Sequence, residues 1–198
     1  MRARYDVTLM ALLLAAAFPL SAQRPGTDES RPRQGFWFAT GLGAGREAEQ
    51  CDGCAASGRQ TGTVVHLAAG TTLTPDLRIG LDLTAWSRTL QGVGDQYDGT
   101  LTAVVLYYPP GTGGLRLKLG AGASGMSVEP GSFVPASGFG FGGLAGVAYD
   151  LPLGRHVTIA PEVTWFAGRP GDIKQGGSTM ITGARFDVIA VGIDLTFH

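Results

Sequence analysis

The last stretch of the chain alternates between two kinds of residue along its whole length. From Ile189 onward, every second position is large and apolar: Ile189, Val191, Ile193, Leu195 and Phe197. The positions between them are small or polar: Ala190, Gly192, Asp194, Thr196 and His198. Side chains of a β-strand point alternately to its two faces, so this period of two predicts a strand whose faces meet different environments.

Similar alternation recurs along most of the chain. The predicted strands lie near 36–46, 61–73, 77–88, 98–109, 115–126, 139–151, 156–167 and 185–198. Each is long enough for a tilted strand to cross a bilayer, which takes ~9–11 residues. The connections alternate between short turns, at 74–76, 110–114 and 152–155, and longer segments, at 47–60, 89–97, 127–138 and 168–184. Transmembrane barrels have tight periplasmic turns and long extracellular loops, so the pattern predicts an all-β, eight-stranded antiparallel up-and-down transmembrane β-barrel.

The two faces of the predicted strands differ in charge as well as in size. At 115–126 the apolar face carries Leu117 and the opposite face carries Arg116. A charge facing lipid at mid-membrane costs a few kcal/mol, so a charge-free apolar face is what a bilayer requires. The alternative is a soluble, lipocalin-like barrel, which inverts the faces and places Leu117 and Ile193 inside, with Arg116 and Asp194 outside.

Outward-facing aromatic residues are expected at both membrane interfaces, because aromatic side chains favour the headgroup level. Those at the short-turn ends are Phe36, Tyr107, Tyr149 and Phe197, and those near the long-loop ends are Phe139 and Trp165. Two features disagree with a regular barrel. Val104 and Leu106 fall on the inward face, and Pro161 lies within a strand although it has no N–H to donate. They predict a local bulge or a register shifted by one residue.

The N-terminus has the features of a secretory signal peptide. Arg2 and Arg4 precede an apolar core at 7–18, and small residues before Gln23 permit cleavage. The core is too short for a spanning helix, which needs ~20 residues. We therefore expect a signal peptide at 1–22, a flexible periplasmic lead-in at 23–34, and the barrel at 35–198.

Eight alternating strands, short turns on one side and a last strand ending near an aromatic residue resemble the small OmpA/OmpX-like outer-membrane barrel family. The resemblance covers 35–198 and carries no catalytic motif. It implies location in a bacterial outer membrane, contact with outer-membrane lipid, and recognition by the barrel assembly machinery through the C-terminal strand. The terminal aromatic of this family is usually the last residue, whereas here His198 follows Phe197. The net charge of −1 offers no basic field for nucleic acid.

Charged residues on the inward face predict a polar network in the lumen. An eight-stranded barrel is just wide enough for side chains to fill, and enclosed charges must pair or meet water. The alternative is a water-filled ion path. The expected network comprises His66, Arg78, Asp82, Arg88, Arg116, Lys118, Glu162 and Asp194.

Cys51 and Cys54 lie close together in the first long connection, and in an exported protein this spacing favours a local disulfide. A reactive dithiol needs a helix N-terminus, and a metal site needs more ligands than two sulfurs. The alternatives of a redox or metal role therefore have less support. We predict no cofactor and no metal.

One alternative assigns the barrel an enzymatic role. His156, Thr158 and Glu162 share a strand face, and outer-membrane lipid A deacylases are small barrels that use His, Ser and Glu. Such an enzyme needs its hydroxyl nucleophile beside the histidine at the outer end, whereas His156 falls at the periplasmic end. The sequence predicts a structural or surface-interaction role without catalysis. A narrow pore or transporter and a lipid-modifying enzyme are the alternatives, and the segment 168–183 is a candidate surface for an extracellular ligand.

Overall fold

A computed structural model describes residues 35–198 except 55–57, 93 and 131–134. The predicted signal peptide at 1–22 and lead-in at 23–34 lie outside the described residues. Within the described part of the chain, no helix is long and apolar enough to cross a membrane.

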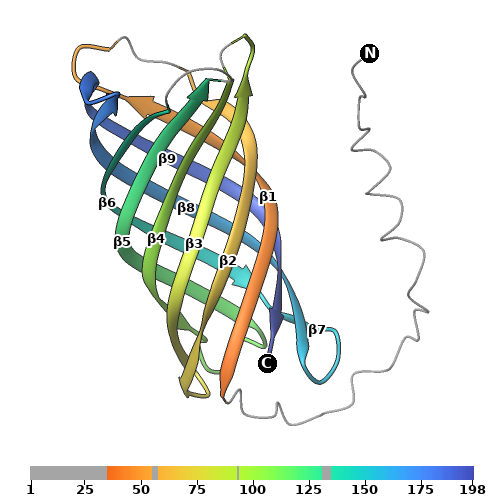
Figure 1. Cartoon of the computed structure of the whole chain (residues 1–198). Coiled ribbons are helices and arrows are strands. Elements are labelled where there is room, and N and C mark those ends of the chain that lie inside the picture. The colour runs from red at the N-terminus through yellow and green to blue at the C-terminus, as the bar shows by residue number, and fades with distance from the viewer. Residues whose placement is uncertain (1–34, 55–57, 93, 131–134) are drawn as a thin grey trace. The chain divides into compact units, whose positions relative to one another are not determined.

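The described residues form antiparallel strands that close into a ring (Figure 1). Each strand pairs with the next along the chain, except that β6 pairs with β8, and the ring closes where β1 pairs with β9. The strands are β1 (Phe36–Gln50), β2 (Gln60–Thr74), β3 (Leu77–Leu90), β4 (Gly94–Tyr107), β5 (Leu115–Pro130), β6 (Ala136–Tyr149), β7 (Leu151–Pro152), β8 (Val157–Gln175) and β9 (Ser178–Phe197). Within the described residues, eight of these strands form the ring. The two-residue β7 is not one of them. The predicted eight-stranded up-and-down barrel is confirmed.

Pro161 explains why β7 is separate from β6. β6 pairs with β8 through Ala148 and Glu162, and β7 continues the same register through Leu151 and Ile159. Pro161 lies between those pairs, where it has no N–H to donate to the ladder. The strand is therefore interrupted opposite Pro161. The prediction of a bulge or register error there was wrong, because the register is the same on both sides.

The extracellular connections are shorter than predicted because the strands continue beyond the bilayer. β3 ends at Leu90 and β4 begins at Gly94, so most of the predicted connection 89–97 is strand. β8 and β9 meet in a hairpin whose turn residues Gly176 and Gly177 have φ of 57° and 88°. Positive φ at both positions suits a tight hairpin turn. The predicted long loop 168–184 was wrong, because the sequence pattern stops alternating by hydrophobicity where lipid ends, while the strands continue.

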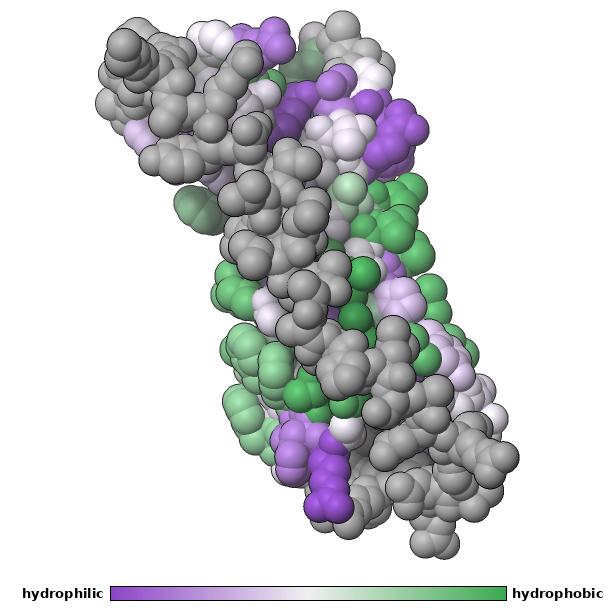
Figure 2. Space-filling model, turned by 90° about the vertical axis from the view of Figure 1, so that its right-hand side faces the viewer, coloured by the Kyte–Doolittle hydropathy of each residue, from purple (hydrophilic) through white to green (hydrophobic). Residues whose placement is uncertain are grey.

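The outer face of the barrel is apolar and the inner face carries the charges. Leu117 is 39% exposed on the outside, whereas Arg116, the residue before it, is 2% exposed inside. Figure 2 shows hydrophobic residues along the middle of the visible face and hydrophilic residues toward both ends. A soluble barrel would have the opposite arrangement, so the lipocalin-like alternative is excluded.

Large side chains fill the lumen on both sides of its centre. Trp37 lies against Gly70 and Gly80, where an added Cβ would come within 2.8 Å of its ring. Trp86 lies similarly against Gly62 and donates its indole N–H to Gly45 O at 3.1 Å. Glycine in these strands therefore makes room for the tryptophans.

β4 keeps a continuous register with both of its neighbours. Val104 and Leu106 are buried in the lumen among the other core residues. The predicted facing of this strand was right, and the suspected shift by one residue was wrong. The inner face of this barrel therefore carries apolar side chains as well as polar ones.

Candidate functional site

A charged network crosses the centre of the lumen, built from strands on opposite sides of the ring. Arg116 on β5 donates to Glu162 on β8 at 2.6 Å and to Asp194 on β9 at 2.9 Å. Lys118, two residues along β5, pairs with Glu162 and lies 3.3 Å from Asp82 on β3. Inward positions on a strand recur every second residue, which is why one strand supplies both cations. The network therefore ties β3, β5, β8 and β9 together across the lumen.

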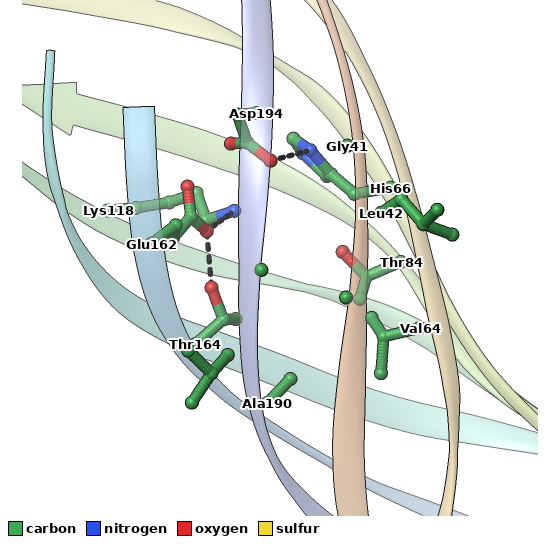
Figure 3. Close-up of a pocket in the computed structure, with 13 residues that line it drawn as sticks. Gly41, Leu42, Val64, His66, Thr84, Lys118, Glu162, Thr164, Ala190 and Asp194 are labelled. Atoms are coloured by element: carbon green, nitrogen blue, oxygen red, sulfur yellow. Dashed lines mark hydrogen bonds and ion pairs between the residues drawn. The ribbon is translucent and has the colours of Figure 1, made fainter. Parts of the chain in front are cut away.

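His66 on β2 closes this network on its other side (Figure 3). Its Nε2 lies 2.7 Å from Asp82, and its Nδ1 lies 3.3 Å from Asp194. Neutral imidazole donates from one nitrogen only, whereas imidazolium donates from both. Two carboxylates at the two ring nitrogens therefore select the protonated ring, and His66 is the third cation of the network.

Threonines and a fourth carboxylate complete the central network. Thr84 donates to Asp82 at 2.6 Å, and Thr164 donates to Glu162. Asp150 lies 3.5 Å from Arg116 and is buried. The sequence prediction did not include these three residues. The predicted alternation already placed both threonines on the inner face, and it placed Asp150 there too, because Asp150 follows the outward Tyr149 in the predicted strand 139–151.

The space left between these side chains is small. The cavity beside the network has a volume of about 30 Å³ and is lined by residues including His66, Lys118, Glu162 and Asp194 (Figure 3). A water molecule needs roughly 10–15 Å³ measured in this way, so the cavity has room for two or three waters. This cavity therefore holds little solvent beside the charged side chains.

The remaining predicted lumen residues lie away from the centre. Arg78 is buried at the periplasmic end, where its guanidinium lies 5.0 Å from the Tyr108 ring and 3.3 Å from the His198 ring nitrogen. Arg88 lies at the extracellular end, over the Trp86 ring, and donates to Gln96 at 2.9 Å. The structure thus separates the eight predicted residues into a central network and two terminal groups.

Arg88 belongs to an acidic cluster that the sequence prediction missed. Glu47 and Glu49 on β1 meet Gln96 and Asp98 on β4 at this end of the lumen. The predicted strands stopped at 46 and began at 98, and therefore excluded most of the cluster. The same alternation, continued a few residues past 46 and a few residues before 98, places Glu47, Glu49, Gln96 and Asp98 on the inner face.

Cys51 and Cys54 are bonded to each other in the connection between β1 and β2, with 5.3 Å between their Cα atoms. The adjacent Asp52 lies 3.1 Å from Arg185 on β9. The loop with the disulfide is therefore attached to the wall of the barrel. No free cysteine is present among the described residues.

The aromatic residues predicted for the interfaces are exposed on the outer surface: Phe36, Tyr107, Tyr149, Phe197, Phe139 and Trp165. At the periplasmic end, Phe38 stacks on Phe197, with 6.3 Å between ring centroids. Phe141 is a further exposed aromatic residue beside Phe139 on β6. Five of the six predicted rings lie near strand ends, whereas Trp165 lies in the middle of β8, so the two interface girdles stay a prediction.

A groove lies on the outer surface of the barrel, toward its extracellular end. It has a volume of about 420 Å³ and runs across β6, β8, β9 and β1. Ala48 and Ala167 line it together with Phe141 and Trp165. Arg169, Arg185 and Asp187 lie along the same groove, so its lining combines aromatic rings with two cations and one carboxylate.

His156 and Glu162 do not form a hydrolytic site. His156 is exposed before the start of β8, whereas Glu162 is buried between Arg116 and Lys118. Six residues of strand separate them by about 20 Å. A nucleophile and its base must lie within hydrogen-bonding reach, so these residues offer no such pair.

Comparison with known proteins identifies the architecture. No family model matches the chain, and no curated protein matches its sequence significantly. Among solved structures, Neisserial surface protein A is 20% identical, with a TM-score of 0.52 over 79% of this chain and 95% of that chain. The chain has the fold of an outer-membrane β-barrel.

Two further structures match with lower scores. The attachment invasion locus protein Ail of Yersinia pestis is 12% identical, with a TM-score of 0.47 over 83% of this chain and 99% of that chain. OprG from Pseudomonas aeruginosa is 17% identical, with a TM-score of 0.43 over 84% of this chain and 97% of that chain. At 20% identity, the match to Neisserial surface protein A shows the barrel fold alone. The apolar outer band agrees with location in a bacterial outer membrane.

Proposed function

We propose that this outer-membrane barrel has a structural or surface-interaction role, with a lumen plugged by its own side chains and no catalytic activity. The main support for this proposal is the ion-pair network of Arg116, Lys118 and His66 with Asp82, Glu162 and Asp194. Its charges pair with one another across the lumen, and the remaining cavity of about 30 Å³ is too small for a hydrated ion path.

Conductance in planar bilayers tests the plug directly. The purified, refolded barrel is expected to give no steady single-channel current, with a reconstituted porin as the positive control. Steady current steps that grow with salt concentration would show a narrow pore and contradict the proposal. If Lys118→Ala changed the size of such steps, the current would be passing through the central network.

The same preparation tests the enzymatic alternative. We expect no ester release from labelled lipid A, because the hydroxyl and histidine that meet near His156, Thr158 Oγ1 and His198 Nε2 at 3.2 Å, lie at the periplasmic end, away from the outer leaflet. Release that disappears in His156→Ala would contradict the assignment as a non-enzyme.

The outward groove supplies the surface for an interaction role, and the chemistry of its lining favours the phosphorylated glycolipid of the outer leaflet. Arg46 on β1 and Arg169 on β8 are exposed, and within the described residues neither side chain pairs with a carboxylate. Trp165 pairs with Ile189, which pairs in turn with Arg46, so basic and aromatic side chains lie at one level of the wall. Arginine binds phosphate bidentately, and the groove between the aromatic rings suits an acyl chain.

Competition between lipids tests this surface. In mixed micelles with equal lipid A and phosphatidylglycerol, native mass spectrometry is expected to show preferential retention of lipid A. The double variant Arg46→Ala/Arg169→Ala should lose that preference, whereas Arg155→Ala, at an exposed periplasmic turn, should keep it. Equal retention of both lipids by the unmodified barrel would rule out a specific groove.

A further inference from the structure

Three carboxylates converge inside the extracellular end of the lumen. Glu47 and Glu49 are inward residues of β1, and Asp98 is an inward residue of β4. One oxygen from each lies within 4.8 Å of the other two. Glu47 and Asp98 are each 1% exposed, so this convergence is not an accident of mobile surface side chains.

The charge of this cluster is not balanced by the protein. Arg88 is the cation within reach among the described residues, and its guanidinium lies 3.7 Å from Glu49. Three carboxylates and one guanidinium leave a formal charge of −2 in a site largely shielded from water. Such a charge is strongly unfavourable unless another cation or protons compensate for it.

The two most buried carboxylates of the cluster each have one oxygen without a hydrogen bond. Glu47 Oε1 and Asp98 Oδ1 are enclosed and have no hydrogen-bond partner in the structure. Buried polar atoms in folded proteins are almost always paired, with protein, water or an ion. The two orphan oxygens therefore indicate a missing partner that interacts with carboxylate oxygens.

The side-chain amide of Gln96 lies between the carboxylates. Its nitrogen contacts Glu47 at 3.3 Å, Asp98 at 2.7 Å, and Glu49. An amide nitrogen carries two hydrogens, so it cannot donate a good bond to all three acceptors. The oxygen of this amide accepts from Arg88 Nε at 2.9 Å, which holds the amide with its nitrogen toward the carboxylates.

We propose that Glu47, Glu49 and Asp98 bind one divalent cation of the calcium class at the extracellular end of the lumen. A charge of +2 neutralises the −2 of the cluster. Oxygen donors alone, with carboxylates predominating, are the ligands that hard cations such as Ca²⁺ prefer. Water completes the coordination. This site is independent of whether the centre of the lumen conducts.

Terbium luminescence tests binding in the refolded full-length barrel. The indole N–H of Trp86 donates a hydrogen bond to Gly45 O, two residues from Glu47. The indole is therefore close enough to sensitise Tb³⁺ bound at the cluster. Saturable emission excited through tryptophan is expected, with displacement by Ca²⁺. The double variant Glu47→Gln/Asp98→Asn should lose it. Asp95→Asn, at an outward position of β4 three residues from Asp98, is the matched control and should retain it.

Thermal unfolding separates a metal site from a site that is neutralised by protons. Ca²⁺ should raise the melting temperature of the unmodified barrel and of Asp95→Asn, because a ligand that binds only the folded state stabilises it. It should leave the double variant unchanged. That variant carries no acidic repulsion and should fold, as shown by heat-modifiable migration on gels. Absence of Tb³⁺ emission and of a Ca²⁺ shift in the unmodified barrel would overturn the proposal, as would an equal response in the double variant.

Discussion

Gly41 leaves the space that Asp194 occupies: a Cβ added to Gly41 would lie 2.0 Å from Asp194 Oδ1. The two residues are direct partners in the β1–β9 ladder. Asp194 cannot move away freely, because Arg116 and His66 hold its two oxygens. The central network therefore depends on a residue that carries no functional group.

Gly41→Ala is expected to lower the free energy of unfolding by about 3 kcal/mol, since it forces a buried carboxylate away from its partners. Urea titration of the barrel in lipid vesicles measures the change. Gly125→Ala is the matched control, because its added Cβ would meet only the exposed Phe139 ring, at 3.3 Å. Equal stability of the two variants would mean that Asp194 is not fixed by its partners.

Arg116 and Glu162 are expected to show strong coupling. Arg116→Leu leaves Glu162, Asp194 and Asp150 near one another with less positive charge, and should cost about 3–5 kcal/mol. The double variant Arg116→Leu/Glu162→Leu removes one charge of each sign and should be less destabilised than the sum of its parts. A double-mutant cycle in urea measures the coupling energy, and additive effects would contradict a direct ion pair.

His66 is expected to carry protons on both ring nitrogens at neutral pH. The geometry favours this, because imidazolium has one hydrogen on each ring nitrogen to donate to Asp82 and to Asp194. Nitrogen-15 NMR of histidine-labelled barrel in micelles distinguishes imidazolium from either neutral tautomer. Exposed His156 provides an internal reference in the same spectrum. A neutral pattern for His66 would show that one of the two contacts lacks a hydrogen.

The disulfide between Cys51 and Cys54 is expected to matter little to the barrel. It closes a very short loop outside the β-ladder, and the loop-entropy model gives at most about 2 kcal/mol for such a closure. The double variant Cys51→Ser/Cys54→Ser should therefore fold and show heat-modifiable migration. Loss of the folded band would indicate that this loop guides assembly of the barrel.

The sequence predicted the strands well within the bilayer and less well outside it. Leu117 and Arg116 alternate because lipid and lumen impose opposite chemistry on successive residues, and this signal is strong. Beyond the bilayer both faces of a strand meet water, so the outward pattern disappears. For this reason the sequence predicts a loop at 168–184, where β8 and β9 in fact extend to the turn around Gly176.

The partners within the lumen were not predictable from the pattern. Alternation shows that Asp82 and Lys118 face inward, but their contact depends on the stagger of β3 relative to β5, which a single sequence does not fix. The acidic cluster was missed for a related reason. Glu47 and Asp98 lie far apart in sequence and near strand ends, where predicted boundaries are least accurate.

Phe197 is expected to guide assembly in addition to its packing on Phe38. We propose that the barrel assembly machinery recognises the C-terminal strand through this aromatic residue, although His198 follows it. The His198 N–H donates to His156 O at 2.9 Å, so the ladder continues past Phe197 and keeps that ring on the outer face. Phe197→Ala should lower the heat-modifiable, outer-membrane fraction in cells severalfold.

Refolding from urea into lipid vesicles separates recognition from packing, because no machinery is present. Phe197→Ala should refold there with nearly the yield of the unmodified chain, as should Phe38→Ala, which removes the same ring stack from the other side. In cells, Phe38→Ala should assemble normally. Equal losses for both variants in cells would assign the effect to the stacked pair, and normal assembly of Phe197→Ala would remove the basis for recognition through the terminal aromatic.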